Sequence, residues 1–270
     1  MNRLVDRLTW ARNGRRLLLV GYLPAGYPGG SEFGQSVGEA FEAGADAMEI
    51  ALPNPPLPMD GPLIQEAVRL GALNINGPED ALGRAVDARV HQFQSIIALA
   101  YRATVDELGT GGLLRICVDS GVDALLLPQH TVPEQLELAV QARAVGLEQV
   151  IFLHLEEDLP VLAASGLERL VIYLQSADVQ TGGGFIAGKA AERLDEVREA
   201  LGDRDAFVLV GFGIRGPDEA HALVGSSADG VIVGTAMVEA ARQGGGAVRD
   251  LVRSIQPALP KLVAGGTRNG

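Results

Sequence analysis

Eight short apolar runs, rich in Val, Ile and Leu, dominate the sequence, and each is continuous rather than alternating. A continuous apolar run is typical of a strand that is buried on both faces of a parallel sheet. Segments with helical periodicity separate the runs, and those at 31–44 and 132–146 end at a glycine suited to a helix C-terminus. Eight strands alternating with helices over about 250 residues predict an α/β protein of the (β/α)8, or TIM-barrel, type. The runs cover residues 17–23, 46–52, 95–101, 123–128, 149–155, 170–175, 207–213 and 230–235.

A doubly wound open sheet is the alternative arrangement for alternating strands and helices. We favour the barrel because eight units are present and no G-x-G-x-x-G follows the first run. The 270 residues then form a single domain, 1–270, since barrels of this size are commonly one domain. We expect an extra helix within residues 1–16, a frayed tail at 265–270, and two helices, at 61–73 and 78–90, after the second strand.

Charge and cysteine content exclude several classes of function. The formal net charge of −12 argues against binding to nucleic acid or to an anionic membrane surface. The single Cys117 cannot form an internal disulfide, and we expect it to pack in the core. The sequence has no zinc-ligand spacing and no dinucleotide fingerprint, so we expect neither a metal nor another cofactor. It also lacks the order of a signal peptide and an apolar run of roughly 18 residues, so we expect a cytoplasmic protein.

Two carboxylates stand out at the second predicted strand. Glu49 lies inside the strand, near its C-terminal end, and Asp60 lies in the proline-rich loop that follows. Catalytic residues of barrels lie at the C-terminal ends of strands and in the following loops, so both acids can face one pocket. Burial tends to raise the pKa of a carboxyl group towards that of a useful proton donor and acceptor. The structural alternative is that Glu49 caps a backbone group and that Asp60 starts the helix at Gly61-Pro62.

Three glycine-rich turns follow the last three predicted strands, at 180–188, 211–220 and 233–241. The loops after strands seven and eight form the common phosphate site of barrels, where backbone N–H groups reach the phosphate oxygens. Thr235 could add a hydroxyl to such a site, which would need no lysine or arginine. We also expect the loop 180–188 to act as a lid. The structural alternative is that the glycines only make tight turns.

The motifs in this order resemble those of the tryptophan synthase alpha subunit family, the indole-3-glycerol-phosphate lyases. The most specific match is "AGADAMEIALPNPPLPMDGPLIQ" at 43–65, which is similar to the family's A-G-A-D-x-x-E-[LI]-G-x-P-F-S-D-P-x-A-D-G-P-x-I-Q. Matches also occur at 21–28, 173–183, 210–220 and 229–239, so the resemblance covers nearly the whole chain.

The resemblance implies a retro-aldol cleavage of indole-3-glycerol phosphate, or of a close aryl analogue, to indole and glyceraldehyde 3-phosphate in tryptophan biosynthesis. The family's two catalytic acids fall on Glu49 and Asp60 at the same spacing. Glu49 would protonate the indole C3 position and take the proton of the side-chain hydroxyl, while Asp60 would bind the indole N–H and stabilise positive charge. Tyr173 falls on an active-site tyrosine of the family.

The remaining site residues are also implied by the resemblance. The phosphate would be bound by Gly182, Gly213, Gly234 and Thr235, the last of which replaces the usual serine. The indole pocket and lid would comprise Tyr22, Leu99, Tyr101, Leu127, Thr181 and Phe212, although the apolar residues among them could equally be plain core.

The chain departs from the family on the side that faces the partner beta subunit. The Ser-Asp pair of the partner loop is absent, and the loop is stiffened by prolines instead, four of which lie within 53–58. Ala103 stands where Asn is usual and Gln129 where Asp is usual; in the lid, Ala177 replaces Arg and Gln180 replaces Val. These changes spare the acids and the phosphate glycines. We therefore expect a specialised paralogue that retains lyase chemistry, with weakened coupling to a beta-like subunit, and that works alone.

Two alternatives to this function stay open. The same barrel and phosphate site could act on a different phosphorylated substrate in specialised metabolism. The chain could also be a non-catalytic subunit that activates a beta-like partner, although the presence of both Glu49 and Asp60 argues against that.

Overall fold

A closed barrel of eight parallel strands forms the centre of the protein, with each strand paired to its neighbours in chain order and β8 paired to β1. A computed structural model describes residues 2–57, 60–153, 155–175 and 187–259. The predicted TIM barrel is therefore confirmed, and the open sheet is not the arrangement found. The strands are β1 Leu18–Pro24, β2 Ala47–Ala51, β3 Ser95–Leu99, β4 Ala124–Leu126, β5 Glu148–Leu153, β6 Arg169–Gln175, β7 Asp205–Gly211 and β8 Gly230–Val233.

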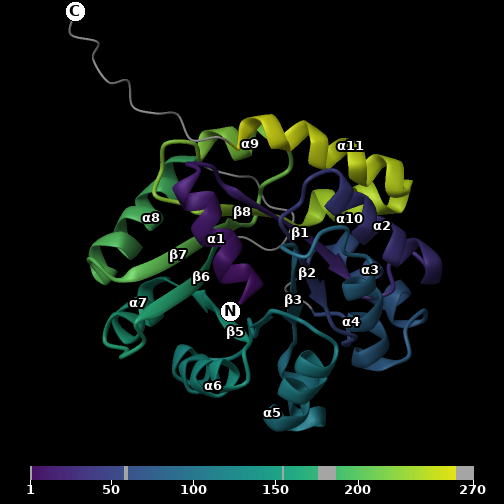
Figure 1. Ribbon diagram of the computed structural model, residues 1–270, viewed down its shortest axis with the longest axis horizontal. Helices are drawn as coiled ribbons and strands as arrows, with labels where there is room; N and C mark the ends of the chain where they lie inside the picture. Colours follow the sequence, from purple (N-terminus) through teal and green to yellow (C-terminus); the bar gives the residue numbers. More distant parts are fainter. Residues whose placement is uncertain (1, 58–59, 154, 176–186, 260–270) are drawn as a thin grey trace, which may run out of the picture.

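Helices surround the strands and bury their outer faces (Figure 1). The helix α1 is the extra N-terminal one that the sequence predicted, and it lies at the N-terminal end of the barrel rather than in the outer ring. The helices are α1 Arg3–Asn13, α2 Gly30–Glu42, α3 Pro62–Ala72, α4 Gly77–Asp87, α5 Arg102–Asp119, α6 Val132–Ala144, α7 Leu155–Ala163, α8 Ala187–Leu201, α9 Pro217–Ala222, α10 Thr235–Gln243 and α11 Gly245–Ile255, followed by the 3-10 turn Gln256–Ala258.

Local sequence explains where several helices begin and bend. The helix α6 starts with a capping box, in which Thr131 and Glu134 satisfy each other's backbone N–H groups. The helix α3 starts with Pro62, whose missing N–H costs nothing in a first turn. The helix α5 is kinked at Gly109, whose φ of +66° is accessible to glycine at little cost. Cys117 is fully buried on α5, as expected, and burial raises the pKa of its thiol to about 12.

The register of three neighbouring strands sets the geometry of the C-terminal end of the barrel. Tyr22 on β1 is the direct partner of Glu49 on β2, so their side chains lie on the same face of the sheet. On the other side of β1, Gly21 pairs with Val233, the last residue of β8. The residue after β8, Gly234, therefore lies level with Tyr22. The order β8–β1–β2 places Tyr22 between this turn and Glu49.

The N-terminal end of the barrel is held by four buried acids, and each of them pairs with two arginines. Their side chains are at most 3 % exposed. The pairs are Asp46 with Arg7 and Arg16, Asp123 with Arg3 and Arg89, Glu148 with Arg143 and Arg169, and Asp229 with Arg12 and Arg198. Three of the arginines, Arg3, Arg7 and Arg12, come from α1. The network therefore fastens α1 across this end of the barrel.

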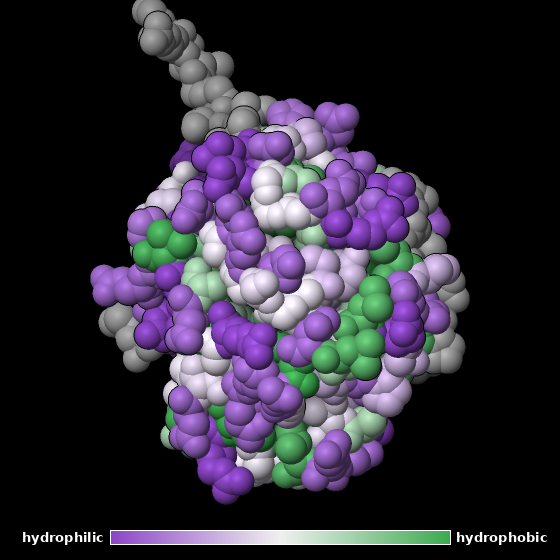
Figure 2. Space-filling view, turned by 90° about the vertical axis from the view of Figure 1, so that its right-hand side faces the viewer, coloured by the Kyte–Doolittle hydropathy of each residue, from purple (hydrophilic) through white to green (hydrophobic). Residues whose placement is uncertain are grey.

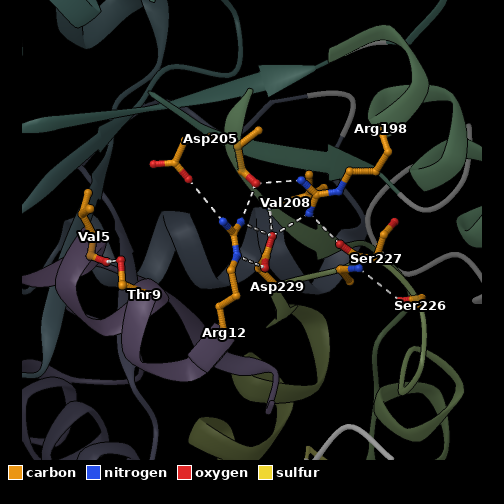
Figure 3. Close-up of polar contacts among 11 residues, drawn as sticks. Val5, Thr9, Arg12, Arg198, Asp205, Val208, Ser226, Ser227 and Asp229 are labelled. Atoms are coloured by element: carbon orange, nitrogen blue, oxygen red, sulfur yellow. Dashed lines mark hydrogen bonds and ion pairs between the residues drawn. The ribbon is translucent and has the colours of Figure 1, made fainter. Parts of the chain in front are cut away.

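The cluster around Asp229 shows how these acids also serve the strands (Figure 3). Arg12 donates to Asp229 over 2.9 Å and Arg198 over 2.7 Å, while the backbone N–H of Val208 at β7 donates to the same carboxylate over 2.9 Å. Asp46 and Asp123 accept backbone N–H groups in the same way, from Leu19 and Ile96. Each carboxylate thus has both charge partners and hydrogen bonds, the condition under which a buried charge is tolerated.

The outer surface mixes hydrophilic and hydrophobic residues, as on the side of the molecule that carries α2, α3 and α4 (Figure 2). Several large apolar side chains are exposed, and the most exposed of them is Leu73, at the end of α3. In the part of the chain that the structure describes, no helix is both long enough and apolar enough to span a membrane.

Candidate active site

Glu49 lies in the middle of β2 with only 3 % of its surface exposed. Its carboxyl oxygen Oε2 is buried and has no hydrogen-bond partner, so Glu49 is not fully engaged in capping a backbone group. Burial raises the pKa of Glu49 to about 8, because the ionised form has lost its hydration. The side chain therefore carries a proton at neutral pH and is poised to donate it.

Asp60 lies in the loop between β2 and α3 and is 7 % exposed. The N-cap of α3 is Gly61, without a side-chain hydrogen bond, so Asp60 does not have the helix-starting role that was the structural alternative. Its backbone carbonyl accepts a hydrogen bond from Gln65 Nε2 over 2.6 Å, which fixes the loop against the first turn of α3. Burial raises the pKa of Asp60 to about 6, so this carboxyl group is mostly ionised at neutral pH.

Three tyrosines face the two acids. Burial raises the pKa of Tyr22 well above its ordinary value, and the charges of Tyr101, Asp60, Glu49 and Tyr173 raise it further. Burial likewise raises the pKa of Tyr101 and of Tyr173, with a contribution from Glu49 in both cases. Glu49 on β2 and Tyr173 on β6 come from opposite sides of the eight-stranded ring. Their coupling therefore runs across the barrel interior, and the five groups share one site.

An aromatic cluster forms the wall of the site on the β5–β7 side. The ring of Tyr173 lies 5.1 Å from that of Phe152 and 6.0 Å from that of Phe212, between ring centroids. Gly211 makes room for Tyr173, because a Cβ there would lie 2.2 Å from the tyrosine hydroxyl oxygen. Phe212 adopts a φ of +67°, a left-handed conformation that a bulky residue rarely takes and that is often found at functional sites.

Sequence reasoning singled out Tyr173 and Phe212 but missed Phe152. The signal that could have found it is its position near the end of the fifth apolar run, one strand away from Tyr173, since the two are direct partners in the β5–β6 register. The predicted pocket residues Leu99 and Leu127 lie at the end of β3 and just after β4. Both belong to the buried apolar core, which is compatible with either of the roles considered for them.

The predicted phosphate turns lie at the same end of the barrel. Gly213 follows β7 with a φ of +84°, which favours glycine. Gly234 precedes α10, and a Cβ at this position would meet no atom within 4 Å, so the turn opens onto free space. Thr235 is the first residue of α10, where helices leave backbone N–H groups without an intrahelical partner. The other predicted members, Thr181 and Gly182, lie outside the residues that the structure describes.

Taken together, the site offers a protonated carboxyl group, an ionised carboxylate, aromatic walls and a helix N-terminus with free N–H groups. Two carboxyl groups whose environments hold their pKa values apart are suited to separate roles, one in proton transfer and the other in stabilising positive charge. A helix N-terminus suits an anion such as a phosphate. Among the described residues, no group of three or more His, Cys, Asp or Glu side chains could hold a metal ion.

The loops beside the site are tied to one another by their own side chains. Thr104 Oγ1 donates to the carbonyl of Pro53 over 3.2 Å, and Asn54 Nδ2 donates to the carbonyl of Pro55 over 2.6 Å. Arg102 bridges the loops after β3 and β4: its backbone N–H donates to Gln129 Oε1, and its guanidinium donates to the carbonyl of Gln129.

Comparisons with known proteins give one consistent result. A family model described as "Tryptophan synthase alpha chain" matches residues 8–258. Among curated relatives, the tryptophan synthase alpha chain of Mycobacterium ulcerans is 31 % identical, with 89 % of this chain and 88 % of the relative covered. That of Carboxydothermus hydrogenoformans is 28 % identical, with 88 % and 89 % covered.

Solved structures agree with the sequence relatives. A tryptophan synthase structure from Mycobacterium tuberculosis has a TM-score of 0.83 at 26 % identity, covering 96 % of this chain and 98 % of the other. A structure from Aquifex aeolicus also has a TM-score of 0.83, at 25 % identity, covering 97 % and 100 %. The likeness thus extends over almost the whole barrel.

Proposed function

The chain belongs to the tryptophan synthase alpha chain family, and from this premise we propose that Glu49 and Asp60 are its catalytic acids. The activity is that of a carbon–carbon lyase of tryptophan biosynthesis, the retro-aldol cleavage of indole-3-glycerol phosphate to indole and glyceraldehyde 3-phosphate. The observation that supports the assignment of the acids most directly is the buried, protonated Glu49 with an unpartnered oxygen in the barrel interior. We also keep the prediction of a cytoplasmic location.

Glu49 acts first as an acid and then as a base. Its proton goes to C3 of the indole ring, which makes the ring an electron acceptor. The resulting carboxylate then takes the proton of the side-chain hydroxyl next to the ring as the bond between C3 and the side chain breaks, and the hydroxyl carbon becomes the aldehyde. The net proton transfer is zero for the protein, so Glu49 ends each turnover protonated. A carboxyl group with a pKa near the working pH can perform both steps.

Asp60 stabilises the cation that exists between the two steps. Protonation at C3 places positive charge on the ring, shared with the indole nitrogen. An ionised carboxylate that accepts the N–H hydrogen bond stabilises this charge in a site shielded from water. The pKa of about 6 keeps Asp60 ionised while Glu49 still holds its proton.

The rest of the substrate is bound by the remaining predicted residues. In this proposal the phosphate lies at Gly213, Gly234 and Thr235, together with Gly182, and Thr181 belongs to the lid. The indole ring lies among Tyr22, Leu99, Tyr101, Leu127 and Phe212, with Tyr173 beside Glu49. Phe152 joins this pocket because its ring contacts that of Tyr173.

Alpha chains of this family pair with a beta subunit. We propose that this chain cleaves its substrate without one. The support is the state of the loops on the partner-facing side. Thr104 donates a hydrogen bond to a carbonyl of the proline-rich loop. The guanidinium of Arg102 donates to the carbonyl of Gln129 and pairs with Glu134 over 2.8 Å. Polar groups that bond within the chain leave fewer of them for a partner, and prolines reduce the loop's freedom to reorder.

The test is turnover by the purified chain alone. Indole release from indole-3-glycerol phosphate would be followed by chromatography, and glyceraldehyde 3-phosphate by a coupled dehydrogenase assay. We expect the chain to release both products, and Glu49→Gln to lose activity by about 10²–10⁴-fold, the usual contribution of a general acid–base group. Full activity in Glu49→Gln would overturn the role of this residue.

The same assay with an added beta subunit separates the partner proposals. A large rise in turnover on addition would contradict the proposal that the chain works alone. Absence of turnover in both conditions would contradict cleavage of this substrate and leave another aryl glycerol phosphate to be sought.

A further inference from the structure

The hydroxyl of Tyr22 is a buried polar group that faces the acids and that the proposed mechanism does not use. Its oxygen is buried without a hydrogen-bond partner, and the residue is 7 % exposed. Buried polar groups in proteins nearly always have a partner, so one that lacks it inside a site is expected to meet a polar atom of a ligand. Burial raises the pKa of Tyr22 well above its ordinary value, so the hydroxyl keeps its proton and can donate it to a hydrogen bond.

The strand register places Tyr22 between the two ends of the reaction site. On one side its direct partner is Glu49, whose Oε2 is also buried and unpartnered. On the other side it lies level with Gly234, because Gly21 pairs with Val233. A ligand that reaches from the acid on β2 to the helix start after β8 must pass the side chain of Tyr22 on β1.

The substrate has such a connecting part. In indole-3-glycerol phosphate a three-carbon chain joins C3 of the ring to the phosphate, and it carries two hydroxyl groups. Glu49 takes the proton of the hydroxyl next to the ring, and the phosphate lies at Gly234 and Thr235 in the proposed function. We propose that the Tyr22 hydroxyl forms a hydrogen bond with the hydroxyl groups of this chain, and thereby selects aryl phosphates whose side chain is hydroxylated. The inference rests on the proposed positions of the acid and the phosphate.

The experiment compares two ligands that differ only in these hydroxyls. Indole-3-propanol phosphate has the ring and the phosphate of the substrate but neither hydroxyl. Dissociation constants for both would be measured by calorimetry in Glu49→Gln, which slows turnover, with and without Tyr22→Phe. We expect Tyr22→Phe to weaken binding of indole-3-glycerol phosphate by about tenfold to a hundredfold, and binding of the propanol analogue by less than about twofold.

Tyr27→Phe is the matched control, because it removes the same hydroxyl from a buried tyrosine outside the site. Tyr27 follows β1, and burial raises its pKa without a contribution from Glu49 or Asp60. We expect this variant to bind both ligands as its parent does. The unfolding temperature gives a second readout: loss of an unpartnered hydroxyl should leave Tyr22→Phe at least as stable as the parent.

Two results would overturn the inference. One is equal weakening of both ligands, which would mean that Tyr22 contacts only the ring or supports the fold. The other is unchanged binding of both. If the wild-type chain cleaves the substrate while either result is found, only the inference fails. If the wild-type chain neither binds nor cleaves the substrate, the proposed function fails as well.

Discussion

Asp46, just before β2, and Glu49, in the middle of β2, are three residues apart, and both are almost completely buried. Asp46, at the N-terminal end of the barrel, binds two arginines and the backbone N–H of Leu19. Glu49, towards the C-terminal end, has an oxygen with no partner. The difference teaches that burial alone does not assign a role to a carboxyl group. With charge partners it is a structural anchor, and without them it becomes an acid that holds its proton at neutral pH.

The largest effect on stability should come from removing the charge of Asp46, the carboxylate that binds two arginines. Asp46→Asn leaves Arg7 and Arg16 without their carboxylate while both remain mostly buried. We expect a loss of about 3–5 kcal/mol in the free energy of unfolding, on the order of 10 °C in unfolding temperature. Activity per folded molecule should stay unchanged, because Asp46 is not part of the reaction site.

Calorimetry and a turnover assay at a temperature below the transition would check this. Arg69→Ala is a suitable control, since Arg69 pairs with Glu66 on an exposed face of α3 and should leave the unfolding temperature unchanged. A variant of Asp46 that is as stable as the wild type would show that the ion pairs do not fasten this end.

A second effect, of similar size, should appear in the pH dependence of stability. The pKa of Glu49 is about 8 in the folded chain and about 4.5 in an unfolded one, so between these values the folded chain binds a proton that the unfolded chain has lost. Stability contributed by the neutral acid is thus complete below about pH 4.5 and is lost as the pH rises through about 8.

Glu49→Gln is neutral at every pH and should escape this loss. We expect the variant to match the wild type at pH 5 and to be more stable by a few kcal/mol at pH 9, at about 1.4 kcal/mol per unit of pKa shift. Denaturant unfolding of both proteins at the two pH values measures the difference. Equal stability of the two at pH 9 would mean that the folded chain does not hold Glu49 in its neutral form.

The smallest effect concerns the pH dependence of activity, which compares the two acids of the site, Glu49 and Asp60. The proposed mechanism requires Asp60 ionised and Glu49 protonated, so kcat/KM should rise with pH through about 6 and fall through about 8. Beyond either value the change should be about tenfold per pH unit. Asp60→Asn should abolish the rise of kcat/KM near pH 6 and keep its fall near pH 8. Initial rates from pH 5 to 9 (~4 units) measure this. A profile that keeps rising above pH 8 would contradict a protonated Glu49.

Most of the barrel could be predicted from the sequence, because its strands are buried on both faces and read as continuous apolar runs. The limits of the runs were less accurate. The run at 123–128 contains only a three-residue strand, β4, since Leu127 stays buried after the strand ladder has ended. Burial is what the sequence pattern reports, and hydrogen bonding to a neighbouring strand is a separate property.

The sequence predicted the acids at the C-terminal end of the barrel, but not the ion pairs at its N-terminal end. Glu49 stood out because an acid inside an apolar run is rare, and its position in the strand could be counted. The arginines of α1 gave no such signal, because their partners directly precede strands that lie far away along the chain. Arg12, for example, binds an acid 217 residues later. Such pairs depend on the closed barrel and not on any local pattern.

The fastening of α1 has a consequence for how the chain is made. During synthesis α1 leaves the ribosome before the strands of the barrel, whereas Asp229, which pairs with Arg12, directly precedes the last strand. Arg12 of α1 therefore gains this partner only when the barrel is nearly complete. The pair between Arg12 and Asp229 stabilises the closed ring relative to partly formed ones. A nascent chain that ends before Asp229 would leave Arg12 with Asp205 but without Asp229, a difference from the finished barrel that a folding factor could recognise.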